Sequence, residues 1–119
     1  MQDAALFDWL RARADRAETL AGVCTGSMLL GAAGLLDGRR ATPHWRFLDG
    51  MRDAFPAVTV DRDKHFVRDG RVFTSAGISA GIDMSLALVA DCFGQGVARA
   101  TARHMEYPYP DSDARRIVL

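Results

Sequence analysis

The sequence predicts one α/β domain built as a three-layer sandwich, with helices on both faces of a sheet. Segments with helical spacing of apolar residues alternate along the chain with short β-prone runs. Two sharp turns separate such segments, one at Cys24-Thr25-Gly26 and one at Asp69-Gly70. A chain of 119 residues without internal repeats or a long linker suits a single domain.

The composition is that of a globular protein, with 49% hydrophobic and 25% charged residues. Fifteen basic residues balance fifteen acidic ones, so no net field attracts nucleic acid or an anionic membrane, and neither is an expected partner. The N-terminus lacks a secretory pattern, and no apolar run is long enough to span a bilayer. We therefore expect a cytoplasmic domain whose two cysteines are reduced.

The first part of the chain is expected to form a helix, a strand and a second helix. Asp3 caps the first helix. Its inward stripe is expected to consist of Leu6, Trp9, Leu10 and Ala17. Residues 20–23 form a short buried strand that ends at the Cys24 turn. Residues 27–36 are apolar almost all round, as in a helix enclosed by a core, and Asp37-Gly38 ends that helix.

The middle part is expected to contribute an extended segment at 40–44, a helix over 47–55 stopped by Pro56, and a strand at 58–60. The clearest local signal is Asp69-Gly70, which lies between the β-prone runs 65–67 and 72–74. Asp-Gly favours a type I′ hairpin, in which both central residues have positive φ.

The last part is expected to form two helices. The first follows Gly77 and ends at Gly94. Its inward stripe is expected to consist of Ile82, Leu86, Val89 and Phe93. The final helix covers about 95–105, and the prolines of the segment 107–110 cannot continue it.

Cys24 is the first candidate for chemistry. A strand that turns sharply into a helix presents its turn residue outward, where the positive helix N-terminus favours the nucleophilic thiolate. Gly22 and Gly26 flank Cys24 two residues to each side, as in a nucleophile elbow, where larger side chains would crowd the turn. The N–H of Thr25 is then placed to stabilise an oxyanion. A buried, inert cysteine is the commoner alternative.

Several other residues have both a functional and a structural interpretation. His44 is a candidate base or thiolate partner, and otherwise a packing histidine. The hydroxyl of Thr25 either contacts a substrate or caps the next helix. Gly77, Ile78 and the residues up to Gly81 either present backbone N–H groups to a ligand or allow close helix packing.

The remaining candidates are interpreted as structural. Cys92 is expected beside the apolar stripe of its helix, His65 in a hairpin strand and His104 near the end of the last helix. Trp9 and Trp45 are expected to be packing residues. No His or Cys pair has metal-ligand spacing, so neither a metal nor another cofactor is expected.

The segments that carry the Cys24 turn resemble the ThiJ/PfpI family of class I glutamine-amidotransferase-like proteins. The resemblance spans roughly residues 20 to 106. The matching segments are Val23-Cys24-Thr25-Gly26-Ser27 with residues 29–36, then Arg40-Ala41-Thr42-Pro43-His44-Trp45, Val67-Arg68-Asp69-Gly70 and residues 74–83. The Cys-Thr-Gly version looks most like isonitrile hydratase and the amidase-like domains of some AraC-type regulators.

The resemblance implies a flavodoxin-like fold and a role for each matching residue. Cys24 corresponds to the nucleophile and Thr25 to its hydrogen-bonding neighbour, while His44 matches a histidine near the thiol. Gly77 and Ile78 are then the expected substrate contacts. The implied reaction is hydrolase or hydratase chemistry on a small molecule, in which the thiol attacks an isonitrile carbon and water releases an N-substituted formamide.

Two departures from the family pattern modify these expectations. The family begins with further β/α units, which supply a carboxylate beside the thiol. Residues 1–119 are therefore expected to be the C-terminal portion of such a domain, with an unpaired edge at residues 20–23 and impaired activity by itself. Protease-like members have histidine where this chain has Thr25, so protease activity is disfavoured.

Two alternatives remain open. In a ligand-sensing domain of an AraC-type regulator, the cysteine pocket binds a ligand without reaction. In a redox or carbonyl-stress protein, Cys24 is oxidised or takes up a glyoxal adduct. Members of the family are often dimers, so a homodimer is a further expectation.

Overall fold

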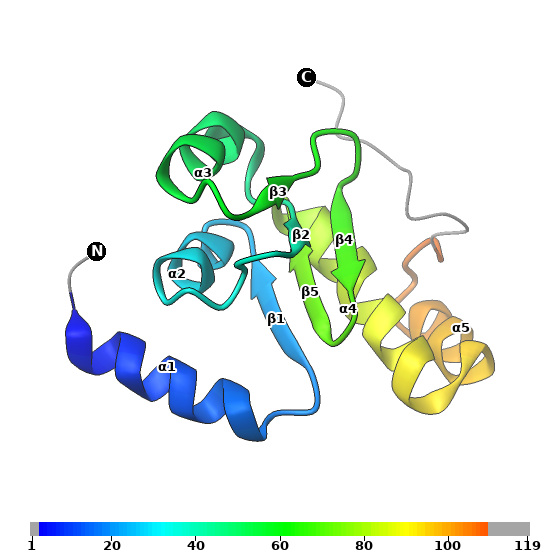
Figure 1. Ribbon diagram of the computed structural model, residues 1–119. Helices are drawn as coiled ribbons and strands as arrows, with labels where there is room; N and C mark the ends of the chain where they lie inside the picture. Colours follow the sequence, from blue (N-terminus) through cyan, green and yellow to red (C-terminus); the bar gives the residue numbers. More distant parts are fainter. Residues whose placement is uncertain (1–2, 110–119) are drawn as a thin grey trace.

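The computed structural model describes residues 3–109, in which helices surround a small sheet (Figure 1). The helices are α1 (Ala4–Arg16), α2 (Gly26–Ala32), the 3₁₀ turn η1 (Trp45–Phe47), α3 (Leu48–Ala54), α4 (Ile78–Phe93) and α5 (Gln95–His104). The strands are β1 (Leu20–Val23), β2 (Arg40–Ala41), β3 (Thr59–Val60), β4 (Phe66–Asp69) and β5 (Val72–Ser75). None of the helices within 3–109 is long and apolar enough to cross a membrane.

The main sheet has the order β1-β5-β4 and lies between two layers of helices. β1 pairs in parallel with β5, and β4 pairs with β5 as an antiparallel hairpin. A second, two-stranded parallel sheet joins β2 and β3. In Figure 1, α4 lies behind the main sheet, while α2 lies on the other side beside β1. The predicted α/β sandwich is therefore confirmed.

Alternate residues of β5 pack into two separate hydrophobic cores. Val72 packs into the cluster under α2 and α3, and Phe73 packs into the cluster under α4. The first cluster consists of the buried residues Leu30, Leu36, Ala41, Met51, Val58 and Val72. The second consists of Phe66, Phe73 and Met84. Because side chains alternate between the faces of a strand, β5 forms the centre of both cores.

Helix α1 begins at the predicted cap, but its inward face differs from the prediction. The side chain of Asp3 accepts a hydrogen bond from Leu6 N–H at 3.0 Å. Phe7 and Ala14 are buried, whereas Leu6 and Trp9 are exposed. The other two predicted residues, Leu10 and Ala17, are partly buried, so the prediction of this face is only partly correct.

Helix α2 ends four residues before the predicted end at residue 36. Gly34 has φ +78°, a left-handed conformation that only glycine adopts without strain. Leu35 N–H donates to Leu30 O at 3.0 Å, across the helix end. The apolar run continues because Leu36 turns back into the core, where it is fully buried.

The β4–β5 hairpin forms where Asp69-Gly70 predicts it, with a different turn. Asp69 pairs with Val72, so the two central residues are Gly70 and Arg71. Gly70 has φ +61°, and Arg71 is not among the residues with positive φ. A positive φ at the first central residue alone is typical of type II′ rather than type I′.

Two further expectations about burial are wrong. Strand β1 has the predicted limits but is not a buried strand, because the side chains of Ala21 and Val23 are exposed. Among the strands within 3–109, only β5 pairs with β1, as expected for an unpaired edge.

On α4, Phe93 is 72% exposed rather than inward, while Leu86 is buried as expected. Gly94 ends α4 with φ +94°.

Candidate functional site

Cys24 occupies a strained turn between β1 and α2. Its φ is +58°, a left-handed value that is rare for a residue with a side chain. Its N–H donates to Ser75 O at 2.9 Å, so the turn is fastened to the end of β5. Such strain persists only where the surroundings enforce it, and it is concentrated at functional sites. The side chain is partly exposed and the thiol is free.

The two glycines that flank Cys24 have different environments. A Cβ at Gly22 would lie 2.9 Å from Leu30 Cδ1 and 3.1 Å from Ser27 Cα, so β1 and α2 approach each other too closely for a side chain. A Cβ at Gly26 would meet nothing within 4 Å. Buried Ser27 donates from its hydroxyl to Gly22 O at 3.2 Å and closes the turn. The expected crowding therefore applies to Gly22 and not to Gly26.

Thr25 precedes α2 and is exposed. Its hydroxyl makes no capping hydrogen bond to the helix, so the capping interpretation of this side chain is wrong. The first hydrogen bond of the turn runs from Met28 N–H to Thr25 O, at 3.0 Å. Because α2 has only seven residues, its contribution to the field at Cys24 is limited to its first backbone N–H groups.

The backbones of His44 and Cys24 are in contact, since the His44 N–H donates to Cys24 O at 3.3 Å. Its Nδ1 accepts a hydrogen bond from Arg46 N–H at 3.2 Å, which caps η1. In a neutral imidazole the proton is then on Nε2, which is a donor. The ring is stacked on Trp45 with a centroid separation of 5.5 Å and is only partly buried.

Gly77 and Ile78 complete the group of predicted site residues. His44 Cδ2 lies 3.8 Å from the position that a Cβ of Gly77 would take. Gly77 precedes α4, and the side chain of Ile78 is 85% exposed at the first position of that helix. Cys24, His44 and Gly77 follow the carboxyl ends of β1, β2 and β5, which is where ligands bind in open α/β sheets.

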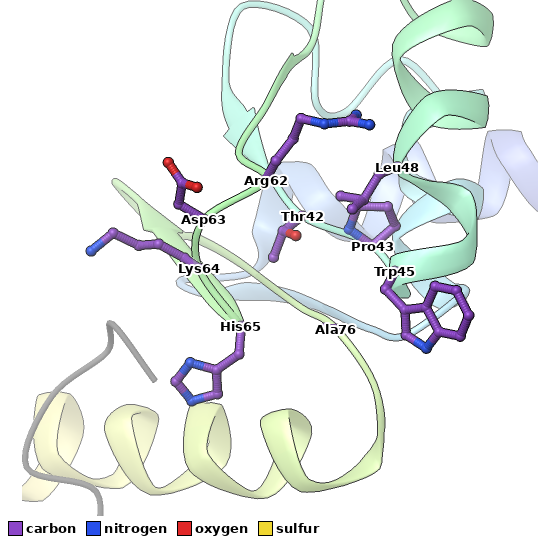
Figure 2. Close-up of a pocket in the computed structure, with 9 residues that line it drawn as sticks. All are labelled: Thr42, Pro43, Trp45, Leu48, Arg62, Asp63, Lys64, His65 and Ala76. Atoms are coloured by element: carbon purple, nitrogen blue, oxygen red, sulfur yellow. The ribbon is translucent and has the colours of Figure 1, made fainter. Parts of the chain in front are cut away.

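A pocket of about 90 Å³ is lined in part by Thr42 and Pro43, which precede His44 in the chain (Figure 2). Figure 2 shows Thr42 and Pro43 at its centre, His65 at one end and Trp45 at the other. Arg62 also lines it and is paired with Asp49. The hydrogen bond and the charge of Arg62, with the charge of Arg52, lower the pKa of the Asp49 carboxyl.

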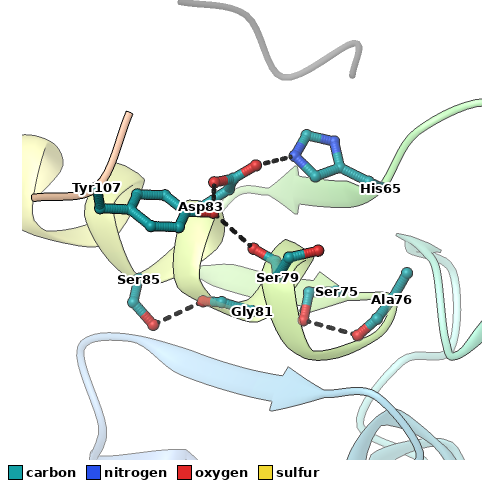
Figure 3. A network of polar contacts seen from close by, with 8 residues as sticks. All are labelled: His65, Ser75, Ala76, Ser79, Gly81, Asp83, Ser85 and Tyr107. Atoms are coloured by element: carbon teal, nitrogen blue, oxygen red, sulfur yellow. Dashed lines mark hydrogen bonds and ion pairs between the residues drawn. The ribbon is translucent and has the colours of Figure 1, made fainter. Parts of the chain in front are cut away.

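A buried polar network surrounds Asp83 of α4 (Figure 3). The sequence did not predict it. His65 Nε2 lies 2.8 Å from Asp83 Oδ2, and both side chains are almost completely buried. Tyr107 donates from its hydroxyl to Asp83 Oδ1 at 2.6 Å. His65 is therefore part of a buried cluster rather than an ordinary strand residue. Asp83 was detectable in the sequence as the one charged residue within the apolar run 76–90.

Three residues interpreted as packing residues are exposed. Cys92 is a free, exposed thiol on α4. Trp9 and Trp45 are 55% and 39% exposed and lie beside Arg13 and Arg46, respectively, in cation–π geometry. Within the described part of the chain, no group of three or more His, Cys, Asp or Glu side chains is arranged to hold a metal ion.

Comparison with known proteins gives consistent matches. The sequence model of the DJ-1/PfpI family matches residues 1–91. Isonitrile hydratase from Pseudomonas putida is 42% identical over 115 residues, which cover 96% of this chain and 49% of that protein. The HTH-type transcriptional regulator CdhR from Pseudomonas aeruginosa is 45% identical over 94 residues, which cover 79% of this chain and 28% of the regulator.

A solved structure supports the same relationship. A ThiJ/PfpI family protein from Pseudomonas syringae has a TM-score of 0.81 and 37% sequence identity. The match covers 96% of this chain and 46% of that structure. The chain thus spans about half the length of the hydratase and of this solved relative.

Proposed function

Because the chain belongs to the DJ-1/PfpI family, we propose that Cys24 is the nucleophile of a hydrolase or hydratase that acts on a small molecule. The observation that carries this proposal is the left-handed backbone of Cys24, at +58°, on a turn fastened to Ser75 and Ser27. The identity with isonitrile hydratase over 96% of the chain favours an isonitrile as the substrate class.

In the proposed reaction, the thiolate sulfur of Cys24 attacks the terminal carbon of the isonitrile R–N≡C. That carbon takes up a proton from water, which gives the thioimidate R–N=CH–S–Cys24 and hydroxide. Water then adds to the same carbon, the carbon–sulfur bond breaks, and the thiolate leaves. The product is the formamide R–NH–CHO, so the net change is the addition of one water molecule.

The neighbouring residues have distinct proposed roles. Thr25 supplies hydrogen-bond donors close to the sulfur. This role is consistent with a hydroxyl that makes no capping hydrogen bond to α2. His44 acts as a donor through Nε2–H, because Nδ1 already accepts from Arg46. Gly77 and Ile78 contact the substrate beside His44. His44 would therefore stabilise the thiolate through Nε2–H, rather than act first as a base.

The proposal predicts formamide formation that depends on Cys24. The purified chain is incubated with cyclohexyl isonitrile, and N-cyclohexylformamide is quantified by mass spectrometry. We expect slower turnover than with P. putida isonitrile hydratase assayed in parallel. Cys24→Ser should reduce turnover to the rate without protein, because serine is a far weaker nucleophile. Cys92→Ser is the matched control and should leave the rate unchanged.

The same assay separates this proposal from the second candidate, a ligand-sensing domain. The 45% identity with part of CdhR supports that alternative. A ligand-sensing domain would bind a small molecule, seen as a rise in Tm, without Cys24-dependent product. Equal product from the wild type and Cys24→Ser would contradict the nucleophile assignment.

A further inference from the structure

The pocket of about 90 Å³ contains a hydroxyl group that the fold does not use. Thr42 lines this pocket and is only 1% exposed. Its backbone N–H donates to the hydroxyl oxygen of Thr74 at 2.9 Å, and the Ser27 hydroxyl lies 3.5 Å from its carbonyl oxygen. Among the residues that the structure describes, none is hydrogen-bonded to the side-chain hydroxyl of Thr42. Buried polar groups without a partner are unusual, because leaving them unpaired costs free energy.

The hydroxyl of Thr42 faces the pocket. Within residues 3–109, every completely enclosed side-chain nitrogen or oxygen atom has a hydrogen-bond partner. Since the Thr42 hydroxyl has none, its oxygen is not completely enclosed, and the space open to this side chain is the pocket (Figure 2). A hydroxyl group can both donate and accept a hydrogen bond. Either the carbonyl or the N–H of an amide ligand would therefore satisfy it.

The pocket walls beside Thr42 are largely apolar and enclose a small volume. Pro43 and Ala76 are buried, Leu48 is partly buried, and the indole ring of Trp45 lies at one end. In the liquid, a water molecule occupies about 30 Å³, so a pocket of about 90 Å³ holds a compact molecule of about three or four heavy atoms.

The charged side chains of the pocket oppose one another. Arg62 is paired with Asp49, and this pairing lowers the pKa of the Asp49 carboxyl. Asp63 and Lys64 also line the pocket and carry opposite charges. These charges balance, so the pocket favours neither an anion nor a cation, and a neutral ligand avoids the cost of burying a charge.

We propose that this pocket is a binding site for a small neutral amide, and that the Thr42 hydroxyl binds the polar group of that ligand. The apolar part of the ligand packs against Pro43, Leu48 and Ala76. Hydroxyl, apolar walls and balanced charges together select this class of ligand over a charged or larger one.

The proposed site is separate from the Cys24 turn but borders His44. Cys24 does not line the pocket, so amide binding does not depend on the chemistry at that thiol. Trp45 lines the pocket, and its ring also stacks on His44 with a centroid separation of 5.5 Å. An occupant would therefore contact the ring that supports His44.

Acetamide and acetate are the probes, because they have the same number of heavy atoms and differ in charge. The chain contains two tryptophans, so Trp9→Phe leaves Trp45 as the one indole N–H signal in ¹⁵N NMR spectra. Acetamide should shift that signal saturably, with a dissociation constant in about the millimolar range for so small a ligand. Acetate should bind at least about tenfold more weakly, because the pocket does not neutralise its charge.

Thr42→Val removes the hydroxyl and keeps the shape of the side chain. Because the fold does not use that hydroxyl, the variant should remain folded and bind acetamide about fivefold more weakly. Thr59→Val is the matched control, since Thr59 is exposed on β3 outside the pocket, and should leave the affinity unchanged. Leu48→Phe fills the pocket and should abolish the acetamide-dependent shift of Trp45.

Four results would overturn the proposal. The first is the absence of a saturable shift of Trp45, and the second is acetate binding as tight as acetamide binding. The third is unchanged affinity in Thr42→Val or in Leu48→Phe, the latter deciding alone if Thr42→Val does not fold. The fourth is loss of binding in Cys24→Ser, which would place the amide at the Cys24 turn; the proposal predicts that this variant binds acetamide like the unmodified chain.

Discussion

Replacing Asp83 by alanine is expected to lower the free energy of unfolding by about 3–5 kcal/mol. The Asp83 carboxylate is fully buried and accepts hydrogen bonds from both His65 and Tyr107. The variant would remove this acceptor from both side chains, although the Tyr107 hydroxyl also lies 3.3 Å from Ser79 O. The larger loss falls on His65, whose side chain is almost completely buried beside Asp83. The loss is a large fraction of the total stability of a small domain, about 5–15 kcal/mol.

Urea denaturation followed by circular dichroism measures this loss, and Asp91→Ala provides the control. Asp91 is also on α4 and pairs with Arg68 at 2.7 Å, but both side chains are partly exposed. Its replacement should change stability by only about 0–1 kcal/mol. Similar losses for Asp83→Ala and Asp91→Ala would show that the buried network does not stabilise the fold.

Replacing Gly22 by alanine is expected to destabilise the protein by about 1–3 kcal/mol. The new Cβ would lie 3.1 Å from the backbone of Ser27 and 2.9 Å from Leu30 Cδ1. The side chain of Leu30 can move, but the backbone of Ser27 can move only with α2. The displacement would also weaken the Ser27–Gly22 hydrogen bond that closes the Cys24 turn.

Gly26→Ala is the matched control at the same distance from Cys24. Its Cβ meets no atom within 4 Å, and alanine in the first turn of α2 should stabilise the protein by up to about 1 kcal/mol. Thermal unfolding should therefore shift in opposite directions for the two variants. Equal shifts would contradict the unequal crowding at the two glycines.

The local features of the fold could be predicted from sequence because neighbouring residues determine them. Asp3 caps α1, the β4–β5 hairpin forms at Gly70, and β1 ends at the elbow as expected. Helical spacing of apolar residues predicted the core-facing side of the helices less accurately than it predicted where the helices lie. On α1, the exposed Trp9 shows that an apolar residue at helical spacing does not always face the core.

The features that could not be predicted depend on contacts between distant segments. Asp83 stands out as a charged residue in an apolar run, but His65, its partner, is 18 positions away and nothing in the sequence links the two. Only the fold places the start of β4 against the middle of α4. The end of α2 likewise depends on Gly34 and on the return of Leu36 into the core. The roles of the candidate site residues stay predictions. That His44 caps η1 through Nδ1 is seen only in the structure.

The most direct test of the central claim is the rate at which iodoacetamide modifies each cysteine, measured by peptide-resolved mass spectrometry. Cys92 is the more exposed thiol, so access alone predicts that it reacts first. Because the Cys24 turn favours the thiolate, we predict that Cys24 reacts faster than Cys92 in the native protein. In denaturant, the two cysteines should react at the same rate. Faster modification of Cys92, or reaction of Cys24 only after unfolding, would contradict the assignment of Cys24 as the nucleophile.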